Sequence, residues 1–346
     1  MHPDPFVTPS SAIISPNIIR YLLKVADAHS VSLDRALRSV SLTRASIDAA
    51  TLRFSYRQGR SIIEQALELL PVRALGVEVG ALQPITSSGV LGLAMMSSAT
   101  LEDAVEIAIR FQNLAGSMVR WRSWKEERSL IVSASLPETD TPVGRFLIEE
   151  GFANITRMAR DVAGIEAPRL IELSYDFAAL GESYRAYFRC PVKRSAAVNA
   201  WHLPIEYAGL TLPAADEWAH REAVSLLEAE ARSVLERQEL VATLAAHIEE
   251  DLPEVKPLSD YARILAVSER TLRRRLVDVG SNYSRVLDDV RKRLAAGHFA
   301  KGELSLSEVS YRLGYSDERS LRRSTLRWFG SQPGELRKSG ALDRTI

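Results

Sequence analysis

The residues whose chemistry is easiest to interpret are arginines near the C-terminal end of the chain. The segment SERTLRRR at 268–275 recurs as DERSLRRS at 317–324, an offset of 49 residues. A guanidinium group presents a rigid fork of donors that fits phosphate oxygens and the O6 and N7 atoms of guanine. The pattern therefore predicts binding of a polyanion rather than catalysis.

The arginines of each copy gather on one face if both segments are helical, at 100° per residue. The residues predicted to face outward are Arg270, Arg273, Arg274 and Val277 in the first copy and Arg319, Arg322, Arg323 and Leu326 in the second. Those predicted to face inward are Leu272, Leu276 and Val279, and Leu321, Thr325 and Trp328. Arg275 projects toward the flank of the inner stripe and is expected to pack its stem or to touch a phosphate. Exposed arginine on one helix is ordinary surface, but two matched faces favour a shared binding role.

Each arginine segment follows a short amphipathic helix and a tight turn. The preceding helices are predicted at 258–265 and 306–313, with Ser268 and Asp317 as N-caps of the helices that follow. This order is typical of a helix-turn-helix unit, and it occurs twice. A helix at 284–300 lies between the copies, and its length of roughly 25 Å suits two recognition helices in successive major grooves. We predict that the DNA-binding residues are Arg270, Arg273, Arg274, Arg319, Ser320, Arg322 and Arg323.

Charge is distributed unevenly along a chain that is neutral overall. Residues 253–346 contain 19 Lys and Arg against 12 Asp and Glu, a net charge of +7, whereas residues 1–252 contain 25 against 32. Such asymmetry indicates a basic module that meets a polyanion and an acidic module that does not.

The first two thirds of the chain predict a mixed domain. Helices are expected at 16–28, 61–70, 100–117, 143–163 and 183–188, a β-hairpin at 119–134, and strands at 170–173 and 198–203. The segment 84–98 is rich in Gly, Ser and Met and is predicted to be a loop with a buried turn. A helix from Pro213 to about Ala231 is followed by a polar boundary at 232–239. We predict an α+β domain at 1–235 and an all-α domain at 236–346 with two helix-turn-helix units joined by a linker helix.

The sequence gives little support for a catalytic, metal-binding or cofactor-binding site. Cys190 is the only cysteine, which excludes an intramolecular disulfide framework and any multi-cysteine metal site. The six histidines are scattered, so no metal, no cofactor and no catalytic residue is expected. SSGVLG at 87–92 fits a packed turn better than a phosphate cradle. Arg110, Arg145 and Arg157 could pair with an anionic ligand, although interior ion pairs explain such residues equally well.

The N-terminus lacks a secretory signal and no apolar run could cross a bilayer, so a cytoplasmic location without membrane contact is expected.

Segments 258–295 and 305–337 together resemble the AraC/XylS family of regulators. The resemblance is carried by the RTL-RRL core, Gly280, Tyr283, the turn at 314–316 and the RWFG-x-x-P ending at 327–333. Ala266 stands where the first turn often has glycine, and Leu321 and Thr325 replace aromatic core residues. The second unit is therefore expected to be packed less firmly than the first.

The N-terminal part is similar to the mixed α/β sensor of one branch of this family, and not to a cupin barrel. The similarity lies at 89–111 and 187–204. It implies a small-molecule effector, a homodimer formed through this domain, and promoter DNA and RNA polymerase as partners, but it transfers no effector-binding residue.

Three functions remain open from the sequence. A ligand-controlled transcription regulator is favoured. An architectural DNA-binding protein without an effector is the second. A DNA-repair enzyme fused to this kind of domain is the third, but the known design needs four zinc-binding cysteines where this chain has one.

Overall fold

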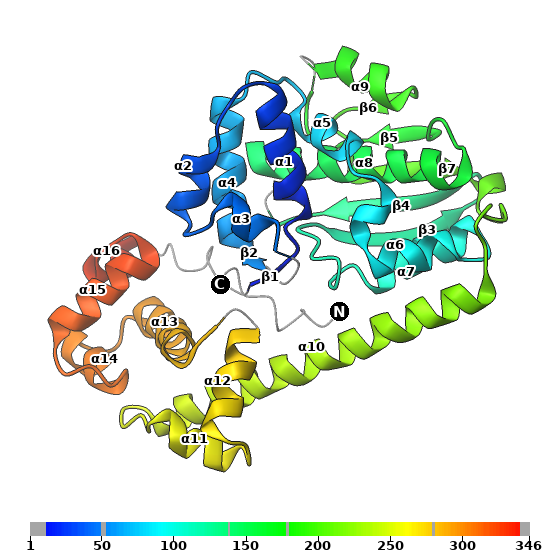
Figure 1. The fold of residues 1–346 in the computed structure, drawn as a ribbon. Helices are drawn as coiled ribbons and strands as arrows, with labels where there is room; N and C mark the ends of the chain where they lie inside the picture. The colour runs from blue at the N-terminus through cyan, green and yellow to red at the C-terminus, as the bar shows by residue number, and fades with distance from the viewer. Residues whose placement is uncertain (1–11, 50–52, 138, 178–179, 279–280, 340–346) are drawn as a thin grey trace. The chain divides into compact units, whose positions relative to one another are not determined.

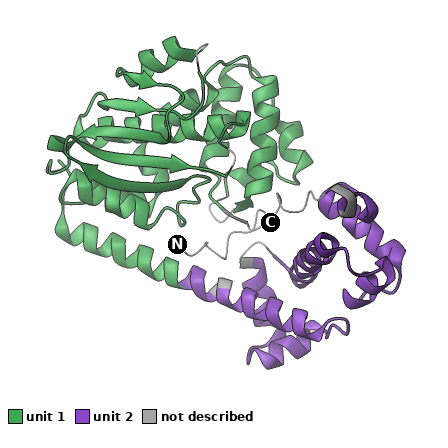
Figure 2. Cartoon of the chain, turned by 180° about the vertical axis from the view of Figure 1, so that it is seen from behind, with its two compact units in different colours: residues 1–232 green, residues 233–346 purple. Residues whose placement is uncertain are grey.

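The computed structural model describes residues 12–49, 53–137, 139–177, 180–278 and 281–339, which divide into two compact units (Figure 2). Unit 1 is residues 1–232 and unit 2 is residues 233–346. In the described residues, unit 1 combines strands with helices and unit 2 is helical throughout. The predicted fold class, a mixed domain followed by an all-α domain, is confirmed.

Unit 1 is built around a five-stranded sheet with the order β3-β4-β7-β5-β6 (Figure 1). The strands are β3 (Arg120–Glu126), β4 (Ser129–Ser135), β5 (Leu170–Glu172), β6 (Val192–Lys193) and β7 (Asn199–Pro204). The β3–β4 hairpin is antiparallel with Trp121 opposite Ala134, which confirms the predicted hairpin. Neighbouring strands are antiparallel except β5 and β6, which are parallel. A separate two-stranded sheet joins β1 (Ala12–Ile14) to β2 (Phe54–Ser55).

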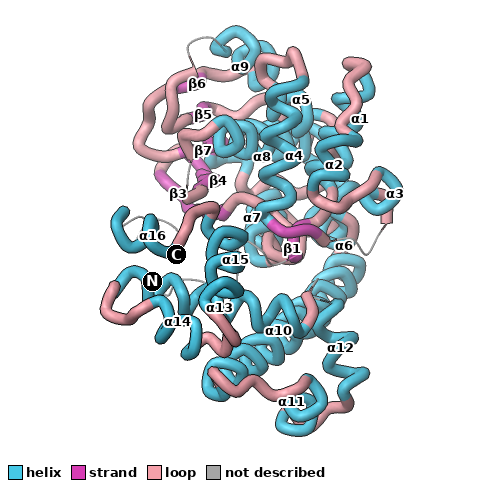
Figure 3. The backbone as a smooth tube through the Cα atoms, turned by 90° about the vertical axis from the view of Figure 1, so that its left-hand side faces the viewer, coloured by secondary structure: helices cyan, strands magenta, loops and turns pink. Residues whose placement is uncertain are grey.

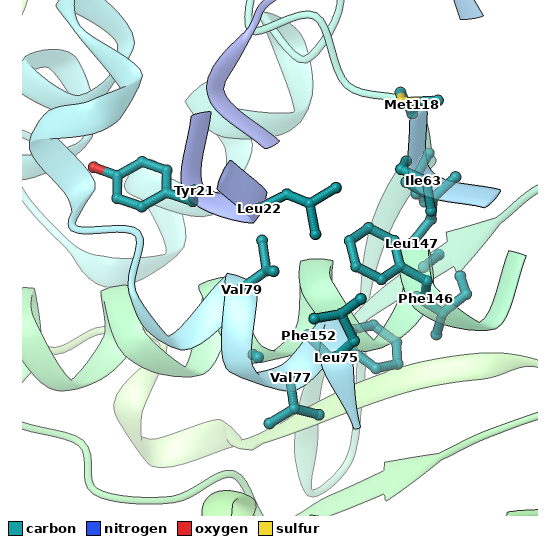
Figure 4. Close-up of a cluster of buried hydrophobic side chains, with 14 of the residues drawn as sticks. Tyr21, Leu22, Ile63, Leu75, Val77, Val79, Met118, Phe146, Leu147 and Phe152 are labelled. Carbon is teal, nitrogen blue, oxygen red and sulfur yellow. The ribbon is translucent and has the colours of Figure 1, made fainter. Parts of the chain in front are cut away.

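The long helix α8 (Pro142–Ala163) is the centre of unit 1, since the sheet packs on one side and helices pack on the other (Figure 3). Trp201 of β7 donates a hydrogen bond from Nε1 to Thr156 Oγ1 of α8 at 3.0 Å. On the other side lie α1 (Asn17–Ala28), α4 (Tyr56–Leu69) and α5 (Leu75–Ala81). Figure 4 shows Leu22, Leu75 and Phe146 within the shared core.

Helix α5 approaches α8 closely because glycine faces it. A Cβ atom at Gly80 would lie 2.1 Å from the carbonyl oxygen of Glu150, so any side chain there would force the two helices apart. The other elements of unit 1 are α2 (Asp34–Ser39), α3 (Arg44–Ile47), η1 (Ile85–Ser88), α6 (Val90–Met96), α7 (Leu101–Arg110), α9 (Gly181–Phe188) and η3 (Ile205–Tyr207).

Two predicted elements of unit 1 are wrong. The segment 84–98 is not a loop but forms η1 and α6, because Leu91 and Ala94 pack against Phe111 and give the segment a buried helical stripe. The helix expected to end near Ala231 is α10 (Glu217–Asp251), which begins later and continues for 35 residues. Residues 232–239 contain neither Gly nor Pro and are mostly good helix formers, so nothing in them ends the helix.

Unit 2 packs its helices into two hydrophobic clusters. Besides the C-terminal part of α10, its helices are α11 (Leu258–Ile264), α12 (Glu269–Asp278), α13 (Tyr283–Lys301), α14 (Leu306–Arg312), α15 (Glu318–Phe329) and α16 (Pro333–Ser339). α13 contributes Val286 and Val290 to the first cluster and Ala296 and Phe299 to the second. It is therefore the predicted linker helix between two helix-turn-helix units.

The two turns of these units have the same backbone requirement but different residues. Ala266, after α11, has a φ of 53°, and Gly314, after α14, has a φ of 69°. A left-handed conformation suits glycine and is strained for alanine.

We expect Ala266→Gly to raise the free energy of unfolding of the full chain by about 0.5–1 kcal/mol, measured by urea unfolding. Ala242→Gly, at an exposed position within α10, is the matched control and should lower it by a similar amount. A loss of stability in both variants would contradict the prediction.

Candidate nucleic-acid interface

The recognition helices α12 and α15 begin at side-chain caps. Ser268 Oγ accepts a hydrogen bond from the backbone N–H of Thr271 at 3.1 Å. Asp317 Oδ1 accepts one from the backbone N–H of Ser320 at 2.7 Å, and this bond helps to lower the pKa of the Asp317 carboxyl. Both predicted N-caps are confirmed, and they fix where each arginine face starts.

The predicted inner and outer faces agree with the observed burial of side chains. Leu272, Leu276 and Leu321 are buried, and Trp328 is half-buried. Val279 lies outside the described residues. The predicted outer residues are exposed in both helices: Arg270, Arg273, Arg274 and Val277 in α12, and Arg319, Arg322, Arg323 and Leu326 in α15. Arg275 is exposed as well.

A glutamate pairs with the second arginine of each face. Glu269 Oε1 lies 2.9 Å from Arg273 Nε, and Glu318 Oε2 lies 3.6 Å from Arg322 Nη2. Both pairs are separated by four residues and occupy equivalent positions in the repeat. Sequence reasoning concentrated on the arginines and missed the glutamates, although their i, i+4 spacing was the available signal.

Ser320 has a local role in addition to its predicted one. Its hydroxyl donates to Asp317 Oδ2 at 3.2 Å and accepts from Arg323 Nη2 at 3.2 Å. The structure thus places it between the cap of α15 and one of the predicted base-reading arginines. This arrangement restrains the guanidinium group of Arg323.

Helix α13 holds the second helix-turn-helix unit through two side chains that sequence reasoning missed. Arg291 donates from Nε to the carbonyl oxygen of Leu313 at 2.7 Å and from Nη2 to that of Gly314 at 2.9 Å. Asp288 accepts from Arg327 Nη2 at 2.6 Å and from Trp328 Nε1 at 2.8 Å. These bonds join α13 to the end of α14 and to α15, so they set the direction of the second recognition helix.

Helix α13 is also bonded to the segment that precedes the first helix-turn-helix unit. Tyr283 donates from its hydroxyl to the carbonyl oxygen of Lys256 at 2.6 Å, and Arg293 pairs with Glu249 of α10. One helix is therefore bonded to both halves of the domain, as a linker that orients two recognition helices must be.

The expected looseness of the second unit needs correction, because Thr325 is fully buried and hydrogen-bonded. Its hydroxyl donates to the carbonyl oxygen of Leu321 at 2.9 Å, which satisfies the polar group without solvent. Ser324 adds a bond of 3.0 Å to Tyr315. A buried, satisfied threonine costs far less than an unpaired one, so residue type alone understated the packing of α15.

Unit 1 holds a pair of buried carboxyl groups on consecutive residues of α8. Tyr184 donates its hydroxyl to Glu149, and Gln83 donates its side-chain amide to Glu150. Burial raises the pKa of each carboxyl to about 7, and the hydrogen bonds oppose this rise without cancelling it. Nothing in the local sequence FLIEEGF distinguishes these glutamates from surface ones.

The arginines of unit 1 that were considered as anion ligands are paired with acidic residues. The closest distances are 2.5 Å for Arg110–Glu228, 2.5 Å for Arg145–Asp140 and 2.7 Å for Arg157–Asp161. Burial raises the pKa of the Cys190 thiol to about 11, which makes it a poor nucleophile at neutral pH.

The described residues contain no group of three His, Cys, Asp or Glu that could hold a metal ion. Among the helices described, none has the length and apolar character needed to cross a membrane.

Comparison with known families identifies both parts of the chain. Residues 31–212 match the arabinose-binding domain of AraC transcription regulators, and residues 261–339 match a helix-turn-helix domain. The chain belongs to the AraC family of transcription regulators. It is thus a regulator with a helix-turn-helix DNA-binding domain and not an enzyme, which sets aside the DNA-repair alternative.

Several known regulators are similar over more than half of the chain. The ornithine utilization regulator of Pseudomonas aeruginosa is 26% identical, covering 92% of this chain and 94% of the relative. The regulator VirS of Mycobacterium tuberculosis is 31% identical over 56% of this chain and 57% of its own length. The solved structure of CdpR from Pseudomonas aeruginosa covers 93% of this chain and 98% of its own, with 23% identity and a TM-score of 0.48.

Proposed function

We propose that the chain regulates transcription by binding a specific DNA sequence with α12 and α15. The residues that would contact DNA are Arg270, Arg273, Arg274, Arg319, Ser320, Arg322 and Arg323. The observation that carries this proposal is the duplicated arginine face, exposed in both helices at equivalent positions above a buried stripe. Arginines arranged in this way fit guanine edges in the major groove, and exposed flanking arginines fit phosphates.

We further propose that residues 1–235 bind a small-molecule effector and form a homodimer, and that residues 236–346 bind DNA and act with RNA polymerase. The match of residues 31–212 to an arabinose-binding domain supports an effector role for this part of the chain. One relative is named for ornithine utilization, so amino acids are the first compounds to screen. A ligand that binds only the folded state raises the melting temperature, which a thermal-shift screen of the full chain detects.

The salt dependence of DNA binding tests the first proposal. We expect the affinity of the full chain for its preferred site, selected from a random library, to fall steeply with salt. A plot of log K against log salt should be a falling line whose slope is about −0.9 for each phosphate contacted. Fluorescence anisotropy between 50 and 200 mM salt measures this slope. A slope near zero would contradict the arginine-based interface, and equal affinity for all sequences would favour the architectural alternative.

A further inference from the structure

Each recognition helix exposes a large aliphatic side chain next to its arginines. Val277 of α12 is 66% exposed and Leu326 of α15 is 48% exposed. Their positions differ by 49 residues, the same offset that relates the arginines. Neither side chain contributes to the hydrophobic clusters of unit 2.

Helix formation alone does not explain Val277. Valine is a weaker helix former than alanine, lysine or arginine, so an exposed valine within α12 stabilises the helix less than these residues would. An aliphatic group also has no donor for a phosphate oxygen. Its occurrence at the same place in both recognition helices therefore favours a contact made by that face.

The spacing of the outer residues matches that of a base-reading helix. Residues 270, 273, 274 and 277 follow the pattern i, i+3, i+4 and i+7, as do residues 319, 322, 323 and 326. The recognition helix of a homeodomain reads the major groove with four residues spaced in this way. Seven residues of helix extend about 10 Å, which fits a groove about 12 Å wide.

The chemistry of the major groove limits what an aliphatic residue can recognise there. Guanine, cytosine and adenine present polar edges, whereas thymine presents a 5-methyl group. We propose that Val277 and Leu326 contact thymine 5-methyl groups, so that each recognition helix reads a thymine beside the bases read by its arginines. This inference rests on the proposed DNA-binding function. It adds the class of base that the fourth residue of each outer face, Val277 or Leu326, selects.

Replacing thymine by uracil tests the contact, because it removes one methyl group and leaves base pairing intact. With the full chain and its selected site, uracil at the contacted position should weaken binding about fourfold, the value of one buried methylene-sized group. The Val277→Ala variant should bind the thymine and uracil forms of the half-site read by α12 with equal affinity. The Leu326→Ala variant should show the same loss of preference in the half-site read by α15. Ile264→Ala is the matched control, since Ile264 is 48% exposed on α11 rather than on a recognition helix; it should keep the fourfold preference.

The outcomes separate this inference from the proposed function. If no sequence is preferred over random DNA, both fail. A second outcome is that the chain prefers one sequence and Arg273→Ala weakens binding to that sequence, while uracil in place of every thymine has no effect. In that case only the thymine contact is wrong. Unchanged DNA binding by Val277→Ala and Leu326→Ala with a loss of transcription in vitro would also overturn it, because the side chains would then contact the transcription machinery.

Discussion

Replacing Arg273 or Arg274 with alanine is expected to weaken binding to the preferred DNA site by about 1–3 kcal/mol, roughly 5- to 150-fold. Both side chains are exposed on α12, above the buried residues Leu272 and Leu276. A bidentate contact to guanine loses both hydrogen bonds on truncation, and the preference for that base should relax. Anisotropy titrations against all single-base variants of the site, at one fixed salt concentration, measure both effects.

Arg275→Ala is the matched control for this prediction. Arg275 is adjacent in sequence and also exposed, but at 100° per residue its position lies on the flank of α12 rather than on the reading face. Its loss should weaken all sequences to a similar extent and leave base preference unchanged. Equal and sequence-independent losses for all three arginines would show that the assignment of faces is wrong.

The DNA-binding unit was predictable because its information is local. The repeated arginine segments, the caps at Ser268 and Asp317 and the apolar spacing each depend on residues within one or two helical turns. The same reasoning gave the correct inner and outer faces of α12 and α15. It also identified Ala266 as unusual, which the positive φ at this residue explains.

The long-range side-chain contacts within each unit were not predictable, since they join residues far apart in sequence. Asp288 meets Trp328 across 40 residues, and Glu150 meets Gln83 across 67. The sequences immediately around Asp288 and Glu150 do not distinguish these residues from surface residues. The helix at 90–96 escaped detection for a related reason, because packing against Phe111 outweighed a composition typical of loops.

Glu149 and Glu150 are expected to make the stability of unit 1 depend on pH in an unusual direction. Their pKa values are raised by burial to about 7 from an ordinary value of 4.5, so the folded state holds protons that the unfolded state releases. The stabilisation is therefore complete below pH 4.5 and is lost as the pH rises through 7, by roughly 3 kcal/mol for each carboxyl.

The variant Glu149→Gln/Glu150→Gln removes this titration while keeping the size of both side chains. The side-chain carbonyl of a glutamine at position 149 can still accept the hydrogen bond from the Tyr184 hydroxyl. A glutamine at position 150 can likewise accept the hydrogen bond from the Gln83 amide. We expect the variant to match the parent chain near pH 4 and to be several kcal/mol more stable at pH 8, measured by urea unfolding across this range. Glu222→Gln, an exposed position of α10, should leave the pH profile unchanged. A double variant that is less stable than the parent chain at pH 8 would mean that the charged carboxylates are satisfied in the fold, because only then does neutralising them remove a favourable interaction.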